Sequence, residues 1–513
     1  VGQAKRMLTF GGRRCMGWGR TVGVRRLLGT AADTNWTKQW KAKCDGITGT
    51  VGSYEESASQ LRDITKSRVI QFTDLRDSPE RFFKAHRILA DRSPELGPGF
   101  FIRYTVQNNL FGGTVLAVGG PEHLEQLEEI QDRGQLGCFA LTERLAGVNS
   151  GLVVNTQVTW QAATGDFLLH TPNEGAEKNW ISQGLVGDKA VVVADLLVSG
   201  SSYGPHAFLM DLREDGRLVE GVTLSDMGLK TMGNDLDNAR IRFDNVRLPH
   251  SAMLNRFATV NPATNEYEKK QNAPTMAMIG QRLYSGRVAV AQAALAFRRR
   301  LFEMTHDYTD QKPCWSPAGQ PALSTIPQLR ALYQEADSRL DSMDRFAAQC
   351  ETALSRYLVQ EALPPDEVTT AIAVAKIKCV EDSIDACFQL KQEVGSYALM
   401  GGTGFDQMDF LQCCKFAEGD SRILMLKLAR DCLRYYQKNG TTEKEDVDFL
   451  CQTITERMGK HLAANGGDKQ AAFDAEAENV YMLANNIMTS TLGQVEESWR
   501  PEYDDKFHFG LSY

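Results

Sequence analysis

The chain lacks a long hydrophobic run and any excess of positive charge. Its 513 residues contain no stretch of about 20 consecutive apolar side chains, the length that a helix needs to cross a bilayer. The formal net charge is −8, whereas nucleic-acid-binding proteins carry clustered positive charge. We therefore predict neither a membrane span nor nucleic-acid binding.

Cysteine is thinly spread and forms no metal-binding pattern. The 11 cysteines include no pair separated by two residues and no cysteine–histidine spacing suited to zinc. An odd number of scattered cysteines favours reduced thiols over a disulfide framework. The sequence therefore predicts no metal site.

Acidic residues are missing from the first 32 positions. Seven lysines and arginines occur there, interleaved with apolar residues such as Leu8, Phe10 and Trp18. This composition is typical of an organelle transit peptide and indicates a transit-like basic arm over residues 1–35. We expect a mitochondrial location, with the peroxisome as the alternative. A basic arm that docks on an acidic partner would have the same composition.

The rest of the chain changes its pattern twice. Apolar residues first follow helical spacing, then form short β-rich segments separated by turn residues, and then return to helical spacing. Long amphipathic segments at 279–304, 326–357, 365–399 and 422–436 predict a helical bundle. The expected fold class is α+β, with an N-terminal helical domain at 55–136, a central β domain at 137–260, a C-terminal four-helix bundle at 274–437 and a polar helical tail at 438–513.

The segment Phe416-Ala417-Glu418-Gly419 places one carboxylate at a turn just before a helical pattern. Helix N-termini present free N–H groups and partial positive charge, and a glycine lets a ligand approach the backbone closely. A carboxylate at such a turn can act as a general base if a pocket covers it. It can equally be an ordinary glutamate in the first turn of a helix.

Other short motifs accompany this turn in a fixed order. Residues 105–113 read TVQNNLFGG, 137–143 read GCFALTE and 178–182 read KNWIS, while 227–230 read MGLK and 243–249 read FDNVRLP. Together with the Glu418 turn, this series resembles the acyl-CoA dehydrogenase and acyl-CoA oxidase superfamily, in particular its oxidase branch.

The resemblance implies an enzyme for the FAD-dependent α,β-dehydrogenation of fatty acyl-CoA thioesters. Glu418 would remove a proton beside the thioester carbonyl, and the neighbouring carbon would give a hydride to flavin N5. Some relatives carry this base on the first long bundle helix, but residues 271–302 contain no Asp or Glu. By the same resemblance, the flavin would contact Phe139, Leu141, Thr142, Trp180, Ser182, Gln392, Gly395 and Lys312, and the substrate would contact Gly147, Asn149 and Gly419.

Three departures from the family pattern leave a second function open. Leu145 and Val148 replace a glycine and a hydroxyl residue, Lys312 stands where an arginine normally reaches the flavin of a neighbouring subunit, and Ser396 and Ala398 replace glycines. An enzyme would pass its electrons to oxygen or to an electron-transfer flavoprotein and would be a homo-oligomer. The alternative is a structural or assembly subunit of a mitochondrial respiratory complex that kept the fold and lost activity.

Overall fold

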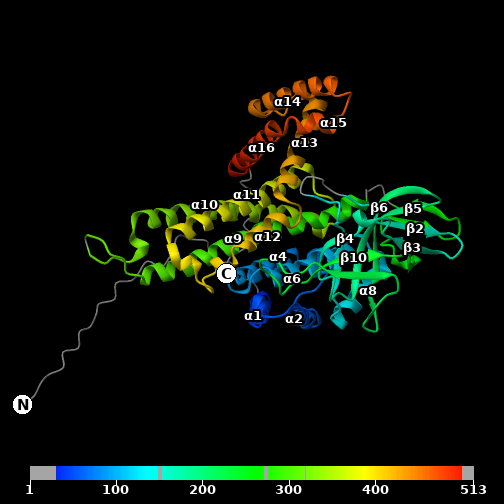
Figure 1. The fold of residues 1–513 in the computed structure, drawn as a ribbon, viewed down its shortest axis with the longest axis horizontal. Helices are drawn as coiled ribbons and strands as arrows, with labels where there is room; N and C mark the ends of the chain where they lie inside the picture. Colours follow the sequence, from blue (N-terminus) through cyan, green and yellow to red (C-terminus); the bar gives the residue numbers. More distant parts are fainter. Residues whose placement is uncertain (1–30, 148–152, 271–274, 318, 499–513) are drawn as a thin grey trace, which may run out of the picture.

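The computed structural model describes residues 31–147, 153–270, 275–317 and 319–498 (Figure 1). Along the chain, a group of helices is followed by the strands and then by a second, longer group of helices. The α+β architecture expected from the sequence is therefore confirmed. No helix in the described ranges is both long and apolar enough to cross a membrane.

The first helical group begins earlier than the sequence predicted. Helix α1 (Ala31–Asp45) starts inside the expected basic arm, of which residues 1–30 lie outside the described part. Trp40 is fully buried, and its indole N–H donates to the carbonyl of Ala85 at 3.0 Å. Trp36, Trp40 and Cys44 form a narrow stripe with one residue per turn. So narrow a stripe gives only a weak helical pattern in the sequence, which is why this helix was missed.

The remaining helices of this group end where the strands begin. Pro79 lies at the first position of its helix, as predicted, because proline has no N–H to lose there. A π-helical turn, η2 (Val106–Phe111), lies between α6 and α7. The helices are α2 (Tyr54–Lys66), α3 (Asp74–Asp77), α4 (Pro79–Asp91), α5 (Ser93–Leu96), α6 (Gly99–Thr105), α7 (Gly112–Val118) and α8 (Pro121–Arg133).

The strands form two main sheets around a shared hydrophobic core. The larger sheet has the order β1-β5-β2-β3-β11, and β6 pairs with β5; the smaller has the order β4-β10-β9. β5 runs parallel to β1 and β2, and the other pairs in both sheets are antiparallel. These strands are β1 (Gly137–Ala140), β2 (Gln157–Gln161), β3 (Asp166–His170), β4 (Lys178–Ser182), β5 (Lys189–Val198), β6 (Ser201–Asp211), β9 (Val222–Asp226), β10 (Asn238–Phe243) and β11 (Val246–Pro249), and the hairpin β12 (Ala258–Asn261)–β13 (Glu266–Lys269) follows them.

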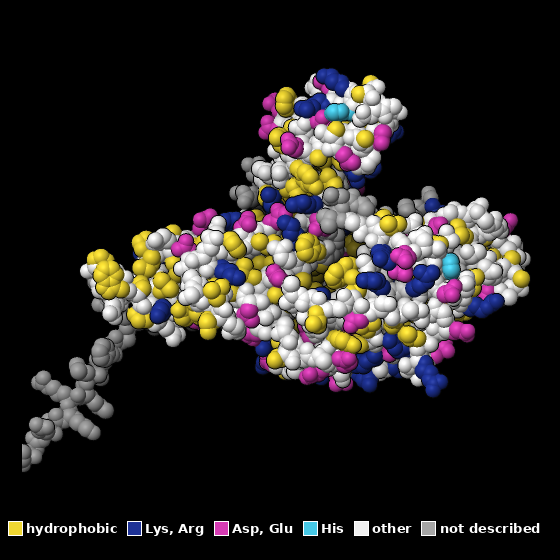
Figure 2. Space-filling view, viewed as in Figure 1, with side chains coloured by type: hydrophobic (Ala, Val, Ile, Leu, Met, Phe, Trp, Pro, Cys, Tyr) yellow, Lys and Arg dark blue, Asp and Glu magenta, His cyan; other side chains and the backbone are white. Residues whose placement is uncertain are grey.

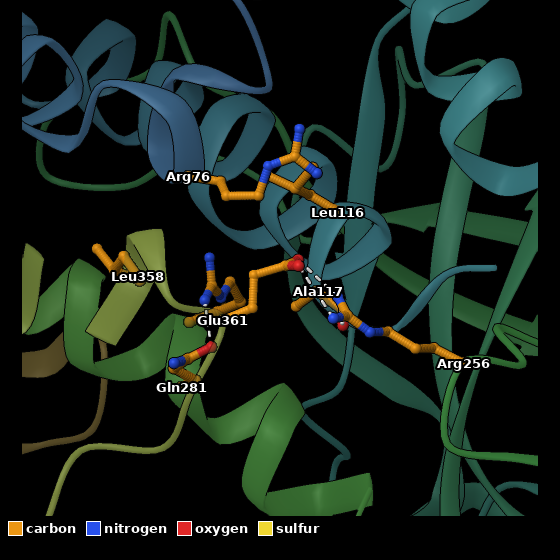
Figure 3. Close-up of a pocket in the computed structure, with 8 residues that line it drawn as sticks. Arg76, Leu116, Ala117, Arg256, Gln281, Leu358 and Glu361 are labelled. Atoms are coloured by element: carbon orange, nitrogen blue, oxygen red, sulfur yellow. Dashed lines mark hydrogen bonds and ion pairs between the residues drawn. The ribbon is translucent and has the colours of Figure 1, made fainter. Parts of the chain in front are cut away.

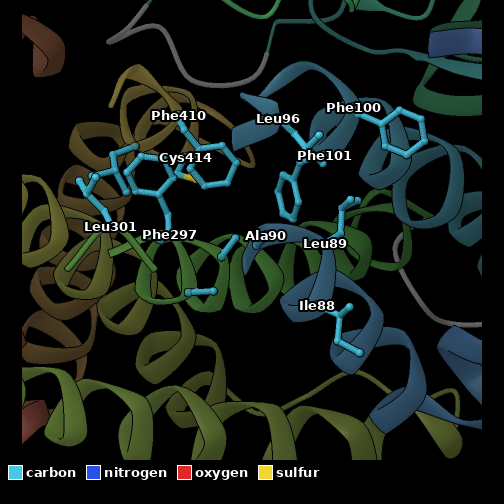
Figure 4. Packing of buried hydrophobic residues seen from close by; sticks show 14 of the residues in the cluster. Ile88, Leu89, Ala90, Leu96, Phe100, Phe101, Phe297, Leu301, Phe410 and Cys414 are labelled. Atoms are coloured by element: carbon cyan, nitrogen blue, oxygen red, sulfur yellow. The ribbon is translucent and has the colours of Figure 1, made fainter. Parts of the chain in front are cut away.

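The bundle packs its long helices side by side and against the first helical group (Figure 1). In Figure 4, Phe297 and Phe410 lie face to face, with ring centroids 5.1 Å apart, and Phe101 packs on the edge of Phe410. This contact joins α6, α9 and α12. The helices are α9 (Thr275–Gln311), α10 (Pro327–Val359), α11 (Asp366–Glu393), α12 (Asp409–Phe416) and α13 (Ser421–Asn439).

The C-terminal segment differs from the polar tail that we expected. Helices α14 (Glu445–Ala464), α15 (Lys469–Asp474) and α16 (Ala477–Ser498) pack with the second half of α13 into a lobe with its own hydrophobic core. Leu424 and Leu428 of α13 belong to the core shared with the bundle, whereas Leu433 belongs to the lobe. Helix α13 therefore connects the bundle to the lobe, which stands apart from the bundle in Figure 1.

Candidate active site

The turn between α12 and α13 holds Glu418 in an unusual backbone conformation. Its φ is +57°, in the left-handed region that residues other than glycine rarely adopt. The Asp420 side chain accepts a hydrogen bond from the N–H of Arg422 at 2.8 Å and so caps α13 directly after the turn. Strained residues held in this way cluster at functional sites.

The carboxylate of Glu418 lies against a glycine of α9. A Cβ atom at Gly286 would stand 2.1 Å from the Glu418 Cδ, so only glycine leaves room for the side chain here. The Glu418 Oε2 is buried and has no hydrogen-bond partner. Burial raises the pKa of Glu418 from 4.5 to about 7, against the opposing effects of Arg287, Asn109 and Lys376. A carboxylate that titrates near neutral pH is suited to proton transfer.

Two buried cations hold the backbone of this turn. The Arg287 Nε donates to the carbonyl of Glu418 at 2.9 Å. The Lys376 Nζ donates to the carbonyl of Gly419 at 2.9 Å and to the Ser421 hydroxyl at 3.3 Å, and burial lowers its pKa to about 7. Sequence reasoning missed both residues. The signal for Lys376 was a lysine directly after the five apolar residues 371–375 of its helix, where a buried charge needs partners.

The π-helical turn η2 connects the first helical group to the same region of α9. The side-chain amide of Asn109 donates to the carbonyl of Arg282 at 2.9 Å, and its oxygen accepts from the Ser285 hydroxyl at 2.6 Å. Asn109 also forms a hydrogen bond that favours the charged form of Glu418. π-Helical turns occur often at functional sites, and here one aims an amide at the candidate base.

A second polar cluster lies one turn along α9 and lines a small cavity (Figure 3). Glu361 accepts two hydrogen bonds from Arg256, at 2.6 and 3.0 Å. Arg282 donates to Gln281 at 2.5 Å, but its Nε is buried without a partner, and burial lowers its pKa to about 10. The cavity is lined by Arg76, Leu116, Ala117, Arg256, Gln281, Arg282, Leu358 and Glu361.

The predicted flavin-contacting residues of the β domain come from two adjacent segments. The N–H of Asn179 donates to the carbonyl of Thr142 at 2.9 Å, and Asn238 donates to the Ser182 hydroxyl at 3.1 Å. Trp180 has a φ of +58° and is 55% exposed, so it does not belong to the core. Phe139 and Leu141 are half-buried beside them. The structure thus brings Thr142, Trp180 and Ser182 together on the β domain.

A fully buried ion pair fastens these two segments together. The Lys178 Nζ lies 2.9 Å from the Glu143 Oε1 and also donates to the carbonyls of Leu141 and Val193. Glu143 further accepts from the N–H groups of Asn155 and Thr156 and from the Thr156 hydroxyl. In the sequence, Glu143 and Lys178 were identified only as members of two motifs, and the ion pair between them was not predicted.

The bundle, which carries Glu418, and the β domain, which carries Trp180, face a hollow of the surface. Figure 2 shows the surface hollowed between the bundle and the β domain, beneath the C-terminal lobe. The Thr231 hydroxyl, in the β9–β10 connection, donates to Asp409 at the start of α12 at 3.4 Å. Gly419 lies beside Glu418, Gly147 is exposed, and Asn149 lies outside the described residues.

The other predicted flavin residues lie at the opposite end of the bundle. Lys312 follows the end of α9, whereas Gln392 and Gly395 lie at the end of α11. The rings of Tyr308 and Tyr397 stack at 3.6 Å and bring the two helix ends together. From Gly286 to Gln311 the helix rises about 37 Å. These residues therefore cannot join the Glu418 site of their own chain, and their predicted role requires a second copy.

Comparisons with known proteins find relatives among the acyl-CoA oxidases. No protein-family model matches the chain. It is 26% identical over 458 residues to the acyl-coenzyme A oxidase of Eremothecium gossypii, covering 83% of this chain and 60% of that protein. It is 27% identical over 412 residues to the peroxisomal acyl-coenzyme A oxidase 2 of Arabidopsis thaliana, covering 73% of this chain and 56% of that protein. The chain thus spans less than two thirds of the length of either relative.

Solved structures share the fold. Acyl-CoA oxidase-2 of Caenorhabditis elegans, bound with FAD, ascaroside-CoA and ATP, superposes with a TM-score of 0.68 at 19% identity, over 91% of this chain and 76% of that one. The order of helices and strands and the series of motifs agree with the similarity to these relatives. The chain is therefore similar in sequence to acyl-CoA oxidases and has the fold of the acyl-CoA dehydrogenase and acyl-CoA oxidase superfamily.

Proposed function

We propose that this protein catalyses the FAD-dependent α,β-dehydrogenation of fatty acyl-CoA thioesters, with Glu418 as the general base. The observation that carries the proposal is the carboxylate of Glu418. One of its oxygens is buried without a partner, and burial raises its pKa to about 7. A structural carboxylate would have found partners, whereas a base needs an oxygen free to accept a proton.

The residues of the β domain fit an aromatic cofactor. The indole of Trp180 is exposed beside the exposed Thr142 and the half-buried Ser182, and it offers an apolar surface with nearby polar groups. These three residues would hold the flavin ring, while Lys312, Gln392 and Gly395 would hold its phosphate end from a second copy. FAD, when bound, supplies the hydride acceptor that no protein side chain can provide.

The residues of the chain itself hold and move the proton. Glu418 would take it from the carbon beside the thioester carbonyl onto its unpartnered oxygen. Arg287 and Lys376 fix the backbone carbonyls of Glu418 and of the following Gly419. They orient the base without forming an ion pair with it, which keeps its pKa near neutral.

Oxygen is the electron acceptor that the relatives favour. The comparisons support neither an electron-transfer flavoprotein nor the assembly-subunit alternative, because the relatives reported above carry the names of enzymes. They also give no support to the mitochondrial location expected from the N-terminal residues. The peroxisomal name of the Arabidopsis relative favours the peroxisome instead. Reduction of oxygen by the two electrons would yield hydrogen peroxide.

The test is to load the purified protein with FAD and add saturated acyl-CoA thioesters of several chain lengths. We expect the flavin absorbance to bleach without oxygen, and peroxide to form in equal amount to enoyl-CoA in air. Trp180→Ala should lower flavin retention, whereas Phe449→Ala, an exposed aromatic on the distant α14, should leave it unchanged. A protein that binds FAD but does not bleach with any thioester would contradict the proposal.

A further inference from the structure

Two cysteines of the C-terminal lobe lie close together on different helices. Cys432 of α13 and Cys451 of α14 are 19 residues apart in sequence, and their Sγ atoms are 3.8 Å apart. Cys451 is fully buried, whereas Cys432 is partly exposed. Cys432 also lines a cavity at the junction of α13, α14 and α16, together with Tyr435, Thr442, Glu443, Lys444, Val447 and Ile487. The sulfur of Cys432 is therefore accessible to solvent, and the buried sulfur of Cys451 lies next to it.

The surroundings of the two thiols differ in a way that suits stepwise oxidation. The hydrogen bond between the two sulfurs is the main influence that lowers the pKa of Cys432, and the charge of Lys444 acts in the same direction. Burial and the charge of Asp448 oppose this lowering. The same hydrogen bond raises the pKa of Cys451 far above its ordinary value. Cys432 is the more exposed of the two thiols, so it is the one that an oxidant reaches first, and its lowered pKa favours the reactive thiolate.

Most other cysteines in the described part of the chain lack this combination. Burial raises the pKa of Cys138, Cys387 and Cys414, and a buried neutral thiol is inert toward oxidants. Cys314 is half-exposed like Cys432, but its thiol donates to the carbonyl of Pro321 at 3.3 Å and not to another thiol. It therefore provides a matched control.

We propose that Cys432 and Cys451 form a peroxide-reactive site that closes to a disulfide. The Cys432 thiolate attacks one oxygen of hydrogen peroxide, an S–O bond forms, the O–O bond breaks and the leaving hydroxide takes a proton to become water. The Cys451 sulfur then attacks the sulfenic acid, an S–S bond forms, the S–O bond breaks and a second water leaves. The two sulfurs supply both electrons, so two thiols and one peroxide give one disulfide and two waters.

The two sulfurs already lie in contact across neighbouring helices. A disulfide needs them about 2.05 Å apart, so closing the bond brings them together from 3.8 Å. The bond would tie α13, which begins three residues after Glu418, to α14. The inference stands apart from the proposed dehydrogenation, although that reaction would supply peroxide to the lobe.

The experiment is to treat the purified, reduced protein with one to five equivalents of hydrogen peroxide and analyse peptides under non-reducing conditions. We expect a peptide pair joined through Cys432 and Cys451, the loss of two free thiols, and full reversal by dithiothreitol. The melting temperature should rise on oxidation because the bond constrains the unfolded chain. Cys451→Ser should stop the reaction at a sulfenic acid on Cys432 that dimedone traps, and Cys314→Ser should change nothing.

Two results would overturn the proposal. One is oxidation of Cys314 at the rate of Cys432, which would show general thiol damage. The other is direct conversion of Cys432 to sulfinic acid in the unsubstituted protein without a crosslinked peptide. Because added peroxide replaces any made by the enzyme, failure of the dehydrogenation assay leaves this result unaffected.

Discussion

Two buried carboxylates, Glu143 of the β domain and Glu418 of the bundle, have opposite surroundings. Glu143 is fully buried, pairs with Lys178 and accepts from two backbone N–H groups and a hydroxyl. Glu418 lies on a strained turn, and its Oε2 has no partner. Both are glutamates in recognisable motifs, yet the oxygens of one are all hydrogen-bonded and the other keeps an oxygen free to accept a proton.

The difference shows that a buried carboxylate can stabilise the fold or take part in a reaction, depending on its partners. A buried ion pair whose hydrogen bonds are all made fixes the position of the backbone. Removing one partner leaves the other as an uncompensated buried charge. A buried carboxylate with a free oxygen is destabilised in its charged form, and its pKa rises toward neutral. Substitutions at the two sites should therefore affect different measurements.

Glu418→Gln should have the largest effect, a loss of activity. The amide keeps the size of the side chain but cannot accept the proton, so we expect kcat to fall by about 10²–10⁴-fold, the usual contribution of a general base. Flavin content should remain close to that of the unsubstituted protein, and the melting temperature should not fall. Steady-state assays with the best acyl-CoA measure this, and unchanged turnover would rule out Glu418 as the base.

Glu143→Gln should act mainly on stability. It leaves the ammonium of Lys178, which is fully buried, without its counter-charge, and breaking such a pair costs about 3–5 kcal/mol. Denaturant unfolding measures the loss. The double variant Glu143→Gln with Lys178→Met should recover part of it. A single variant as stable as the parent would contradict the supporting role.

Gly286→Ala should show the contact between α9 and the base. The added methyl would meet the Glu418 Cδ at 2.1 Å and push the carboxylate away, with an expected loss of about 1–3 kcal/mol in transition-state stabilisation or stability. Gly280→Ala is the matched control, because a Cβ there meets nothing within 4 Å on the same helix. Equal kinetics of the two variants would show that the side chain does not lie against Gly286.

A change of pH should affect both stability and rate through the same carboxylate. The folded state raises the pKa of Glu418 from 4.5 to about 7, so it binds more protons than the unfolded state between these values. Stability should therefore fall as pH rises from about 4.5 to about 7, and Glu418→Gln should remove that slope. The lowered pKa of Lys376 acts above about pH 7, outside this window. The rate should increase through pH 7 as Glu418 loses its proton.

Much of the fold could be predicted because local patterns mark it. Pro79 at a helix start, the β-rich segments 158–160 and 167–169 and the long helices of the bundle all appear where the sequence placed them. Helix α1 was not predicted, because only one of its residues per turn faces the core. The lobe of α14–α16 was taken for a tail because its helices look polar singly and bury their apolar residues only against one another.

The motif residues of the candidate site could be named from the sequence, but the residues that hold them could not. Arg287 and Lys376 act through backbone carbonyls 131 and 43 residues away, and Asn109 reaches α9 from another part of the chain. No spacing rule connects positions so far apart. Lys312, Gln392 and Gly395 matched motifs, yet the length of α9 separates them from Glu418.

The sequence by itself determined which residue types stand at which turns: a glutamate before a glycine, a tryptophan in a flavin-type motif, and helices and strands in a family order. Only the tertiary structure decided that Glu418 keeps a free buried oxygen while Glu143 has none. The reason is physical, since a side chain acquires its pKa from burial and neighbours, and both arise when distant segments pack together.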